Sequence, residues 1–378
     1  MAYHDDYLAY DFGLYNALRE ERLFLAKKMI HSYGLVGPSG AVESEPALPI
    51  DDEISTVHDK SYLQVLKKLS KDPRGFSFSH GLGIADNPVF MGMYEAAAIQ
   101  VGGTILACDS VARHESDRAL NMGGGFHHAL PKRASGFCLL NDVAIGIKRL
   151  LNEHKFKRIM YVDIDVHHSD GVEEIFLEDP KVLKVSLHED GHYLFPGTGA
   201  VDDIGKGSGE GYTINVPLPP YTGDVSYLHA FRKIVMPLAE SFKPEVLFTQ
   251  LGVDAHYADP LAHLNLSTRA YEQVGEALDQ ISSRFCKSRW VAVTGGGYDI
   301  MTCARLWTLM FSKMMGRDLD NTIPMDWMEY CRTAYTSVPE EGALRDPPSA
   351  TGESTVSRAV AKVVEEVKKK TFKYHGLR

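Results

Sequence analysis

Carboxylate and imidazole side chains are concentrated in one short segment, residues 163–170, which reads DIDVHHSD. The segment overlaps the end of the run RIMYVDID (158–165), whose apolar and β-branched residues are typical of a buried strand. Residues two apart in a strand point to the same face of the sheet, so Asp163, Asp165 and His167 are expected to point together. The spacing therefore indicates a cluster of potential metal ligands at the end of a strand.

A further carboxylate, Asp254, follows a second strand-like run, residues 246–252. With Asp165 and His167 it would complete a set of two carboxylates and one imidazole. Three such ligands leave room for a water molecule, which is the pattern of a catalytic metal rather than a structural one. Two alternatives stay open here. Acidic residues at strand ends also cap helices or bind magnesium, and histidines in a capped loop can be satisfied by hydrogen bonds alone.

Two glycine-rich segments also carry residues suited to proton transfer or hydrogen bonding. In GGGFHH (123–128), three glycines allow the backbone to approach a ligand closely, and His127 and His128 follow directly. In GGGY (295–298), Tyr298 could donate a hydrogen bond to a substrate oxygen. A buried histidine is often only structural, and glycine-rich turns are common, so neither segment establishes a site alone.

Several short apolar runs end in polar or glycine-rich residues and alternate with segments of helical spacing, such as 141–151 and 227–241. Continuous apolar strands that alternate with helices are typical of a parallel sheet covered on both faces. Ligands bind such sheets outside the carboxyl ends of the strands, where the polar residues above lie. The glycine- and proline-bearing stretches 76–87 and 196–211 are long enough to be functional or disordered loops. The strand-like runs are 158–165, 182–188, 246–254 and 290–298.

The composition is that of a globular protein without a membrane segment. Among 378 residues there are 40 Lys or Arg and 50 Asp or Glu, and the resulting charge of −10 disfavours nucleic-acid binding and would favour a cationic substrate. An ordinary acidic cytoplasmic protein would carry the same charge. The five cysteines form no C-x-x-C pair, which indicates a reducing compartment. With no visible signal peptide and no run of 18 apolar residues, a cytoplasmic location is expected.

The last part of the chain has the pattern of an amphipathic helix. Residues 354–367 place valines at helical spacing, and the basic residues Lys368–Lys370 suit the end of a helix. We therefore predict a terminal helix, about 354–370, docked on the domain rather than a nucleic-acid-binding tail.

Taken together and in this order, the motifs resemble the histone deacetylase superfamily, which has an arginase-like fold. The similarity runs from about residue 10 to residue 307, and DNPVF (86–90) resembles the class I branch and the bacterial acetoin-utilisation and archaeal proteins beside it. The resemblance implies a single α/β catalytic domain over 1–378, with a mostly parallel central sheet flanked by helices and long active-site loops at the C-terminal ends of the strands. The matching segments are GGGFHHA (123–129), SGFCLLND (135–142), YVDIDVHHSDGVEE (161–174), VSLHEDGHYLFPGTG (185–199), LGVDAHYADPL (251–261) and GGGYDIMTCARLWT (295–308).

The resemblance also implies roles for individual residues. The metal, zinc or in vivo ferrous iron, would be bound by Asp165, His167 and Asp254. The residues that carry out the reaction would be His127, His128 and Tyr298, with Asp163 and Asp170 orienting the two histidines. Arg22 would line an internal product cavity. The residues that bind substrate would be a rim aspartate and the surroundings of a narrow acyl-lysine tunnel: Asp86, Gly136, Phe137, Phe195, Leu261 and Gly296.

Relatives also bind structural monovalent cations, potassium or sodium, at two places. The first site would use residues around the metal centre, several through backbone carbonyls: Asp163, Asp165, His167, Ser186 and Leu187. The second site would use Phe176, Asp179, Val182 and Tyr212.

One departure from the family pattern is visible. In the segment Tyr15–Arg22, the pair Asn16-Ala17 stands where relatives carry a His-Pro pair, although Arg22 is retained. The change puts the shape of the adjacent N-terminal loop in doubt, but not the metal centre.

The implied function is hydrolysis of the amide of acetyl-lysine, in a protein or peptide, to lysine and acetate by a metal-activated water. The alternative substrate is a small acetylated amine such as an acetylpolyamine. A catalytically silent acyl-lysine-binding protein would lack a histidine, the tyrosine or a ligand, and none is missing here. A two-manganese ureohydrolase needs further carboxylates, and Cys138 has no dedicated base to make it a nucleophile.

Overall fold

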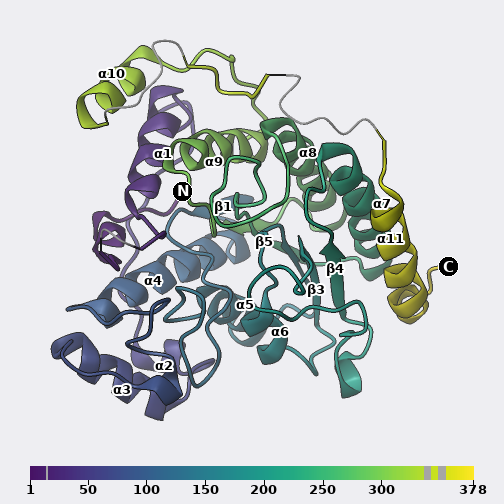
Figure 1. The fold of residues 1–378 in the computed structure, drawn as a ribbon, viewed down its shortest axis with the longest axis horizontal. Coiled ribbons are helices and arrows are strands. Elements are labelled where there is room, and N and C mark those ends of the chain that lie inside the picture. Colours follow the sequence, from purple (N-terminus) through teal and green to yellow (C-terminus); the bar gives the residue numbers. More distant parts are fainter. Residues whose placement is uncertain (14–15, 336–341, 348–354) are drawn as a thin grey trace.

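A six-stranded, fully parallel sheet forms the centre of the computed structural model, which describes residues 1–13, 16–335, 342–347 and 355–378 (Figure 1). The strand order is β1-β6-β5-β2-β3-β4. A parallel sheet was predicted, and it is confirmed. The strands are β1 (Arg118–Asn121), β2 (Ile159–Asp163), β3 (Val182–Glu189), β4 (Thr213–Leu218), β5 (Val246–Gln250) and β6 (Trp290–Val293).

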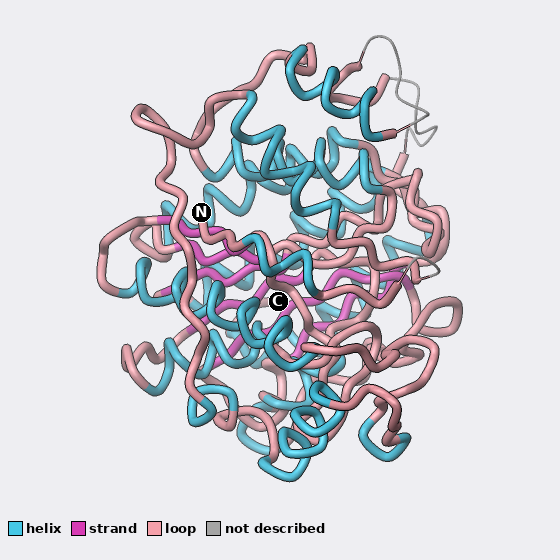
Figure 2. Tube along the Cα trace, turned by 90° about the vertical axis from the view of Figure 1, so that its left-hand side faces the viewer, coloured by secondary structure: helices cyan, strands magenta, loops and turns pink. Residues whose placement is uncertain are grey.

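Helices cover both faces of this sheet, which appears as a layer of strands between two layers of helices in Figure 2. Successive residues of a strand pack on opposite faces of the sheet. In β2, Met160 and Val162 belong to the hydrophobic cluster on one face, and Ile159 and Tyr161 belong to the cluster on the other. This period of two is what a strand with two buried faces requires. The result is a single α/β domain with three layers.

The helices divide between these two clusters. The first face is covered by α1 (Glu21–Ser32), α7 (Asp224–Phe242), α8 (Thr268–Phe285) and α9 (Ile300–Met314), with α10 (Met325–Ala334) outside them. The second face is covered by α4 (Met93–Ala112), α5 (Asp142–Asn152) and α6 (Asp170–Ile175), with α2 (Asp51–Ile54) and α3 (Lys60–Lys71) outside. Short 3-10 turns lie at Asp5–Ala9, Phe78–His80, Gly207–Gly209 and Phe372–His375.

The strand order decides which loops meet. From β2 the chain proceeds outward to β3 and β4, and it then returns to β5 beside β2 and continues to β6 on the other side. The direction of winding therefore changes between β2 and β5, and ligands bind parallel sheets at such a switch point. The loops that follow β1, β6, β5 and β2 all lie at the carboxyl ends of these neighbouring strands. They carry GGGFHH, GGGY, Asp254 and the segment 163–170.

Two strands were not anticipated from the sequence. β1 has only four residues, and β4 contains a proline, Pro217, near its end. Neither offers a long apolar run, so tertiary pairing rather than local pattern places them in the sheet. β2, β5 and β6 lie within the predicted runs, and β3 extends one residue beyond its run 182–188. The predicted helices 141–151 and 227–241 correspond to α5 and α7.

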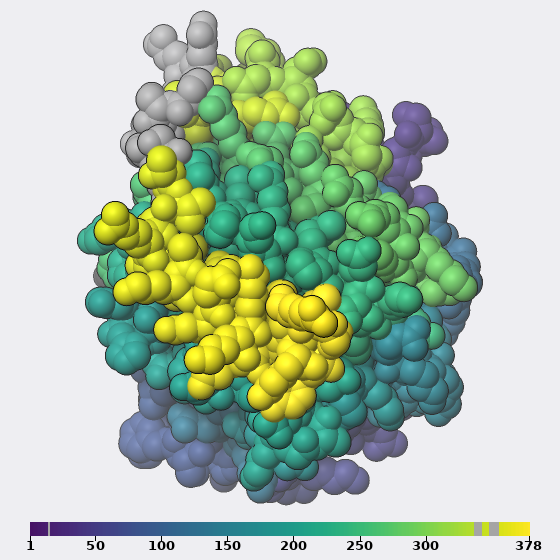
Figure 3. All heavy atoms as spheres, turned by 90° about the vertical axis from the view of Figure 1, so that its right-hand side faces the viewer, coloured from purple at the N-terminus to yellow at the C-terminus, as the bar shows by residue number. Residues whose placement is uncertain are grey.

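The chain ends in a helix that packs on the surface of the domain, as predicted. Helix α11 (Arg358–Thr371) lies across α7 and the edge strand β4, and Figure 3 shows this last part of the chain on the face turned to the viewer. Its valines Val360, Val364 and Val367 are buried. The predicted start at residue 354 lies outside the described residues. None of the helices that the structure describes is long and apolar enough to span a membrane.

Candidate metal centre and active site

Three of the predicted ligands converge at the switch point between β2 and β5. Asp165 and His167 follow β2, and Asp254 follows β5. One donor atom from each lies within 4.8 Å of the others, and all three residues are buried. The Nδ1 atom of His167 is 3.0 Å from an oxygen of Asp165 and 3.1 Å from an oxygen of Asp254. The geometry thus brings together two carboxylates and one imidazole around a common point.

The electrostatics of these side chains fit a divalent cation. Burial and the neighbouring carboxylate of Asp165 raise the pKa of Asp254 to about 7. Two buried carboxylates this close repel each other unless a positive charge lies between them. Carboxylate oxygens and an imidazole nitrogen are also the donors that zinc and ferrous iron accept. The residues present therefore suit such a metal.

Neighbouring groups hold the two carboxylates in place. The amide nitrogen of Gln250 and the N–H of Gly296 donate to one oxygen of Asp165, at 2.6 and 2.8 Å. The N–H of Val166 donates to Asp254 at 2.8 Å. A Cβ atom on Gly296 would lie 2.0 Å from the Asp254 carboxylate, so only glycine fits at this position.

Gln250 was missed by the sequence analysis, although a signal was present. It is the last residue of β5, where it pairs in register with Asp163 of β2. A fully buried amide at the end of an apolar strand, four residues before a predicted ligand, indicates a polar partner inside the site.

The two adjacent histidines form a hydrogen-bonded pair. The Nδ1 atom of His127 is 2.7 Å from Asp163, and that of His128 is 2.6 Å from Asp170. Their Nε2 atoms are 3.0 Å apart. If both Nδ1 atoms donate to carboxylates, a hydrogen bond between the Nε2 atoms needs one proton shared by the pair. The arrangement can therefore hold one proton and accept another.

The two histidines have opposite pKa shifts. Burial acts to lower both values, but the carboxylates of Asp163 and Asp165 outweigh it at His127 and raise that pKa to about 9. At His128, burial and the charge of His127 lower the pKa to about 4. His127 is therefore the protonated partner and His128 the neutral one.

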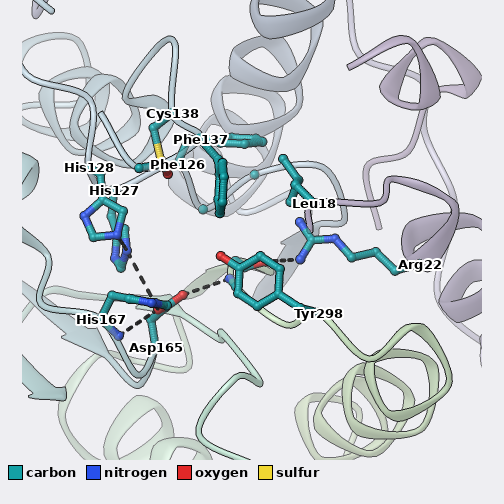
Figure 4. A pocket seen from close by; sticks show the side chains of 15 residues that line it. Leu18, Arg22, Phe126, His127, His128, Phe137, Cys138, Asp165, His167 and Tyr298 are labelled. Atoms are coloured by element: carbon teal, nitrogen blue, oxygen red, sulfur yellow. Dashed lines mark hydrogen bonds and ion pairs between the residues drawn. The ribbon is translucent and has the colours of Figure 1, made fainter. Parts of the chain in front are cut away.

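Tyr298 lies across the cavity from the histidine pair, with its hydroxyl directed into the space that these residues surround (Figure 4). Burial raises its pKa well above the usual value, and the carboxylates of Asp254 and Asp165 act in the same direction. The phenol therefore stays protonated and can donate a hydrogen bond.

Asp259 is a second residue that the sequence analysis missed. One of its oxygens accepts the N–H of Tyr298 at 2.8 Å, and the other accepts the N–H of Leu261 at 2.9 Å. The carboxylate thus connects the loop of Tyr298 to a predicted tunnel wall. The signal in the sequence was a second aspartate five residues after Asp254.

Aromatic and glycine residues enclose the approach to the centre. The ring of Phe195 lies 5.0 Å from that of His128, and the ring of Phe137 lies 5.9 Å from that of Tyr298. Gly136 fits between the first pair, because a Cβ there would lie 2.6 Å from His128 and 2.7 Å from Phe195. Leu261 reaches the site through the Asp259 contact described above. Of the predicted tunnel residues, Gly136, Phe137 and Gly296 line one narrow cavity of about 30 Å³, whereas Phe195 and Leu261 are not among its lining residues.

Asp86, in contrast, does not line this cavity. It is exposed on the loop 83–87, where the N–H of Gly83 donates to the carbonyl of Asn87. The same loop region contacts the tunnel wall, since the N–H of Ala134 donates to the carbonyl of His80 at 2.9 Å. Asp86 therefore lies outside the cavity proper, on a loop of the surrounding surface.

Arg22 is buried and lines the cavity. Its guanidinium donates to the carbonyls of Gly295 and Gly297, at 2.9 and 2.8 Å, and Leu18 lines the cavity beside it. In the departing segment, the side-chain oxygen of Asn16 accepts the N–H of Leu18. Leu18 therefore lines the cavity although the preceding pair has changed. Tyr15 lies outside the described residues.

Cys138 also lines the cavity, but its environment opposes a role as nucleophile. Burial raises the pKa of the Cys138 thiol well above its usual range. Its sulfur lies 3.2 Å from the carbonyl oxygen of Gly136. A nucleophilic cysteine needs a lowered pKa and a base beside it, and this thiol has the opposite shift.

The residues of the two predicted monovalent-cation sites are placed differently. At the first, Ser186 pairs in register with Asp163, and its hydroxyl lies 2.8 Å from Nδ1 of His188. At the second, a side-chain ammonium is already present: Nζ of Lys184 donates to the carbonyls of Phe176 and Val182. The first set stays a prediction.

The chain is similar to known proteins over most of its length. The family model described as histone deacetylase domain matches residues 16–314. The acetoin utilization protein AcuC of Bacillus subtilis is 38% identical over 353 residues, which are 92% of this chain and 90% of that protein. AcuC of Staphylococcus aureus is 33% identical over 330 residues, or 86% and 84% of the two chains. AcuC of Staphylococcus xylosus is 32% identical over 330 residues, or 86% and 85%.

Proposed function

Since the chain belongs to the histone deacetylase family and is thus a deacetylase that hydrolyses amide bonds, we propose that it is a metal-dependent deacylase of acetyl-lysine in proteins or peptides. The observation that carries the proposal is that three groups of side chains meet at one buried cavity. They are the Asp165–His167–Asp254 triad, the histidine pair and the Tyr298 hydroxyl.

A divalent metal bound by Asp165, His167 and Asp254 would polarise the amide carbonyl and lower the pKa of an attacking water. The neutral imidazole of His128 takes the proton that the water loses as its oxygen bonds to the carbonyl carbon. Tyr298 donates a hydrogen bond to the oxygen that gains negative charge, a contribution of about 3–4 kcal/mol to lowering the barrier. The histidine pair then returns a proton to the amine nitrogen as the C–N bond breaks, which leaves acetate and the free amine.

Metal dependence is tested with Asp254→Ala. The variant should purify without the metal and without activity on an acetyl-lysine peptide, measured by elemental analysis and an acetate-release assay. The matched control is Asp52→Ala, which removes an exposed carboxylate far from the cavity. Stoichiometric zinc or iron in Asp254→Ala would contradict the ligand assignment. Comparing zinc- and iron-loaded wild-type enzyme identifies which metal supports turnover.

The choice of a peptide substrate is supported by exposed aromatic side chains. Tyr193, two residues before Phe195, has an exposed aromatic side chain. The stacked and exposed pair Phe76 and Phe78 precedes His80, whose carbonyl accepts the N–H of Ala134. Aromatic side chains of this kind suit binding of a flexible chain. If acetylputrescine were hydrolysed with a higher kcat/KM than acetyl-lysine peptides, a small acetylated amine would be the substrate instead.

We also propose a cytoplasmic location and no direct nucleic-acid partner. All five cysteines are free and buried. Their reduced state and the formal charge of −10 support both statements.

A further inference from the structure

Lys184 is a buried lysine in strand β3 of the sheet. All residues of this strand are buried, and the exposed fraction of Lys184 is 3%. Lysine is almost never buried to this extent without partners. Its ammonium is 2.6 Å from the carbonyl oxygen of Phe176 and 3.4 Å from that of Val182. The charge is therefore bound by backbone carbonyls.

These carbonyls belong to the loop that connects α6 to β3. Phe176 is the residue that directly follows α6, at the end where the last carbonyls of a helix have no partner within the helix and carry partial negative charge. The same loop closes on itself, because the N–H of Asp179 donates to Phe176 and the N–H of Val182 donates to Asp179. Tyr212 completes the surroundings by accepting the backbone N–H of Lys184 at 3.0 Å.

Three of these residues contact Lys184 directly, and Asp179 bonds to two of them. Together they are the four residues expected to bind a second monovalent cation: Phe176, Asp179, Val182 and Tyr212. A free cation and the ammonium cannot both occupy this place. Two positive charges at such a separation in a buried environment repel strongly, and the carbonyl of Phe176 already faces Nζ. The surroundings thus fit the side chain that is present, and not an additional ion.

We propose that the ammonium of Lys184 is a covalently tethered cation that takes the place of the second monovalent ion in this chain. Tethering has a physical advantage, because a side-chain ammonium loses less translational freedom on binding than a free ion does. The α6–β3 loop, which begins shortly after His167 and Asp170, would then keep its conformation independently of the salt in solution. The first site near Asp163 is not affected by this proposal.

The direct test uses thallium(I), an anomalous scatterer that substitutes for potassium. Crystals of the wild-type protein grown in thallium(I) acetate should show no anomalous peak beside the carbonyl oxygens of Phe176 and Val182. Crystals of Lys184→Thr should show one, because the substitution removes the ammonium and frees both carbonyls. Lys181→Thr is the matched control, since Lys181 is exposed three residues away in the same segment, and it should resemble the wild type.

Thermal unfolding tests the same point in solution. In potassium chloride, compared with choline chloride at equal ionic strength, the Tm of Lys184→Thr should rise by about 5 °C more than that of the wild type or Lys181→Thr. Lys184→Arg retains a tethered charge and should show no such additional rise.

Two results would overturn the proposal. One is a thallium peak beside Phe176 in the wild-type protein, which needs no variant to be folded. The other is a folded Lys184→Thr that shows neither a thallium peak nor a specific response to potassium. If Lys184→Thr does not fold, the proposal is decided by the wild-type thallium map and by the Tm of Lys184→Arg in potassium chloride. A thallium peak beside Phe176, or an additional rise in the Tm of Lys184→Arg, contradicts the tethered cation. The lack of both supports it.

Discussion

At the scale of single residues, each reactive side chain of the cavity has a partner that sets its orientation and its protonation state. Asp163 and Asp170 accept from the two histidines, Gln250 donates to Asp165, and Asp259 accepts the N–H of Tyr298. Partners of this kind determine which ring nitrogens and oxygens carry a proton before substrate binds. Substituting a reactive residue should remove a group that takes part in the reaction. Substituting its partner should only displace that group, so the expected loss of kcat is smaller.

Replacing Tyr298 with Phe removes a hydroxyl but retains the ring that packs near Phe137. Because the hydroxyl is the donor to the developing oxyanion, kcat should fall roughly 10²- to 10³-fold. Metal content should be unchanged, since Tyr298 is not a ligand. Turnover of an acetyl-lysine peptide and elemental analysis of the same preparation measure both. Full activity of the Phe variant would show that the carbonyl is polarised by another group.

Replacing Asp259 with Asn should act through Tyr298. An amide offers one oxygen where the carboxylate offers two, so one of the N–H groups of Tyr298 and Leu261 loses its acceptor. A small displacement of Tyr298 should lower kcat by about 10- to 100-fold. The expected change in KM is smaller, because most of the cavity is unaltered.

Asp52→Asn is the control for Asp259→Asn, since it makes the same chemical change at an exposed position. A role in stability alone would lower Tm without changing kcat at a temperature where the variant is folded, and that result would contradict positioning.

At the scale of elements, the loops that carry the site are bonded to the helices that flank the sheet. His58, which follows α2, is one such connection: its Nε2 atom accepts the N–H of Asn141, the N-cap of α5, at 2.9 Å. Its Nδ1 atom lies 3.1 Å from the carbonyl of Leu130 and donates to it. Both ring nitrogens are used, and protonation of Nε2 would break the bond to Asn141. Burial accordingly lowers the pKa of His58 to about 4.

This shift predicts how stability depends on pH. The pKa of His58 rises to its ordinary value of 6.5 on unfolding, so between pH 6.5 and pH 4 the unfolded chain binds a proton that the folded protein does not. The free energy of unfolding should therefore decrease as the pH falls, by about 2 kcal/mol from this residue between pH 7 and pH 5.

The measurement is urea unfolding at the two pH values for the wild type and for His58→Gln, which has no group that titrates. The variant should lose about 2 kcal/mol less than the wild type between pH 7 and pH 5. Equal losses in both proteins would assign the pH dependence to other groups.

At the scale of the whole molecule, the sheet needs cover at its open edge. β4 is an edge strand, and α11 packs against it and against α7 (Figure 3). An uncovered edge would leave unpaired backbone groups and apolar side chains in contact with solvent. The C-terminal helix is therefore part of the domain rather than an appendage.

Val364→Asp tests this dependence. Val364 is only 1% exposed, so the substitution would bury an unpaired carboxylate against the domain. The free energy of unfolding should fall by about 3 kcal/mol, measured by chemical denaturation. Lys362→Asp introduces the same residue on the exposed side of the same helix and should have little effect. If the two variants were equally stable, α11 would not contribute to the stability of the domain.

The sequence by itself determined the local chemistry of this protein. Asp165 and His167 are two residues apart after an apolar strand, so period-two geometry alone predicted that they point together, and the tandem histidines were evident beside three glycines. The alternation of apolar runs and helical segments likewise predicted a parallel α/β sheet, since each pattern reflects burial of that segment. These features are local, because they depend on spacing within a few residues.

Only the tertiary structure decided which of these segments meet. Asp254 reaches Asp165 because β5 pairs with β2, and Tyr298 reaches them because β6 pairs with β5. Gln250, Asp259 and Lys184 are ordinary polar residues in the sequence, and each acquires its contacts from a partner elsewhere in the fold. Strand order and burial are properties of the whole chain, because they depend on which surfaces exclude water together. The periodicity of a single segment does not contain that information.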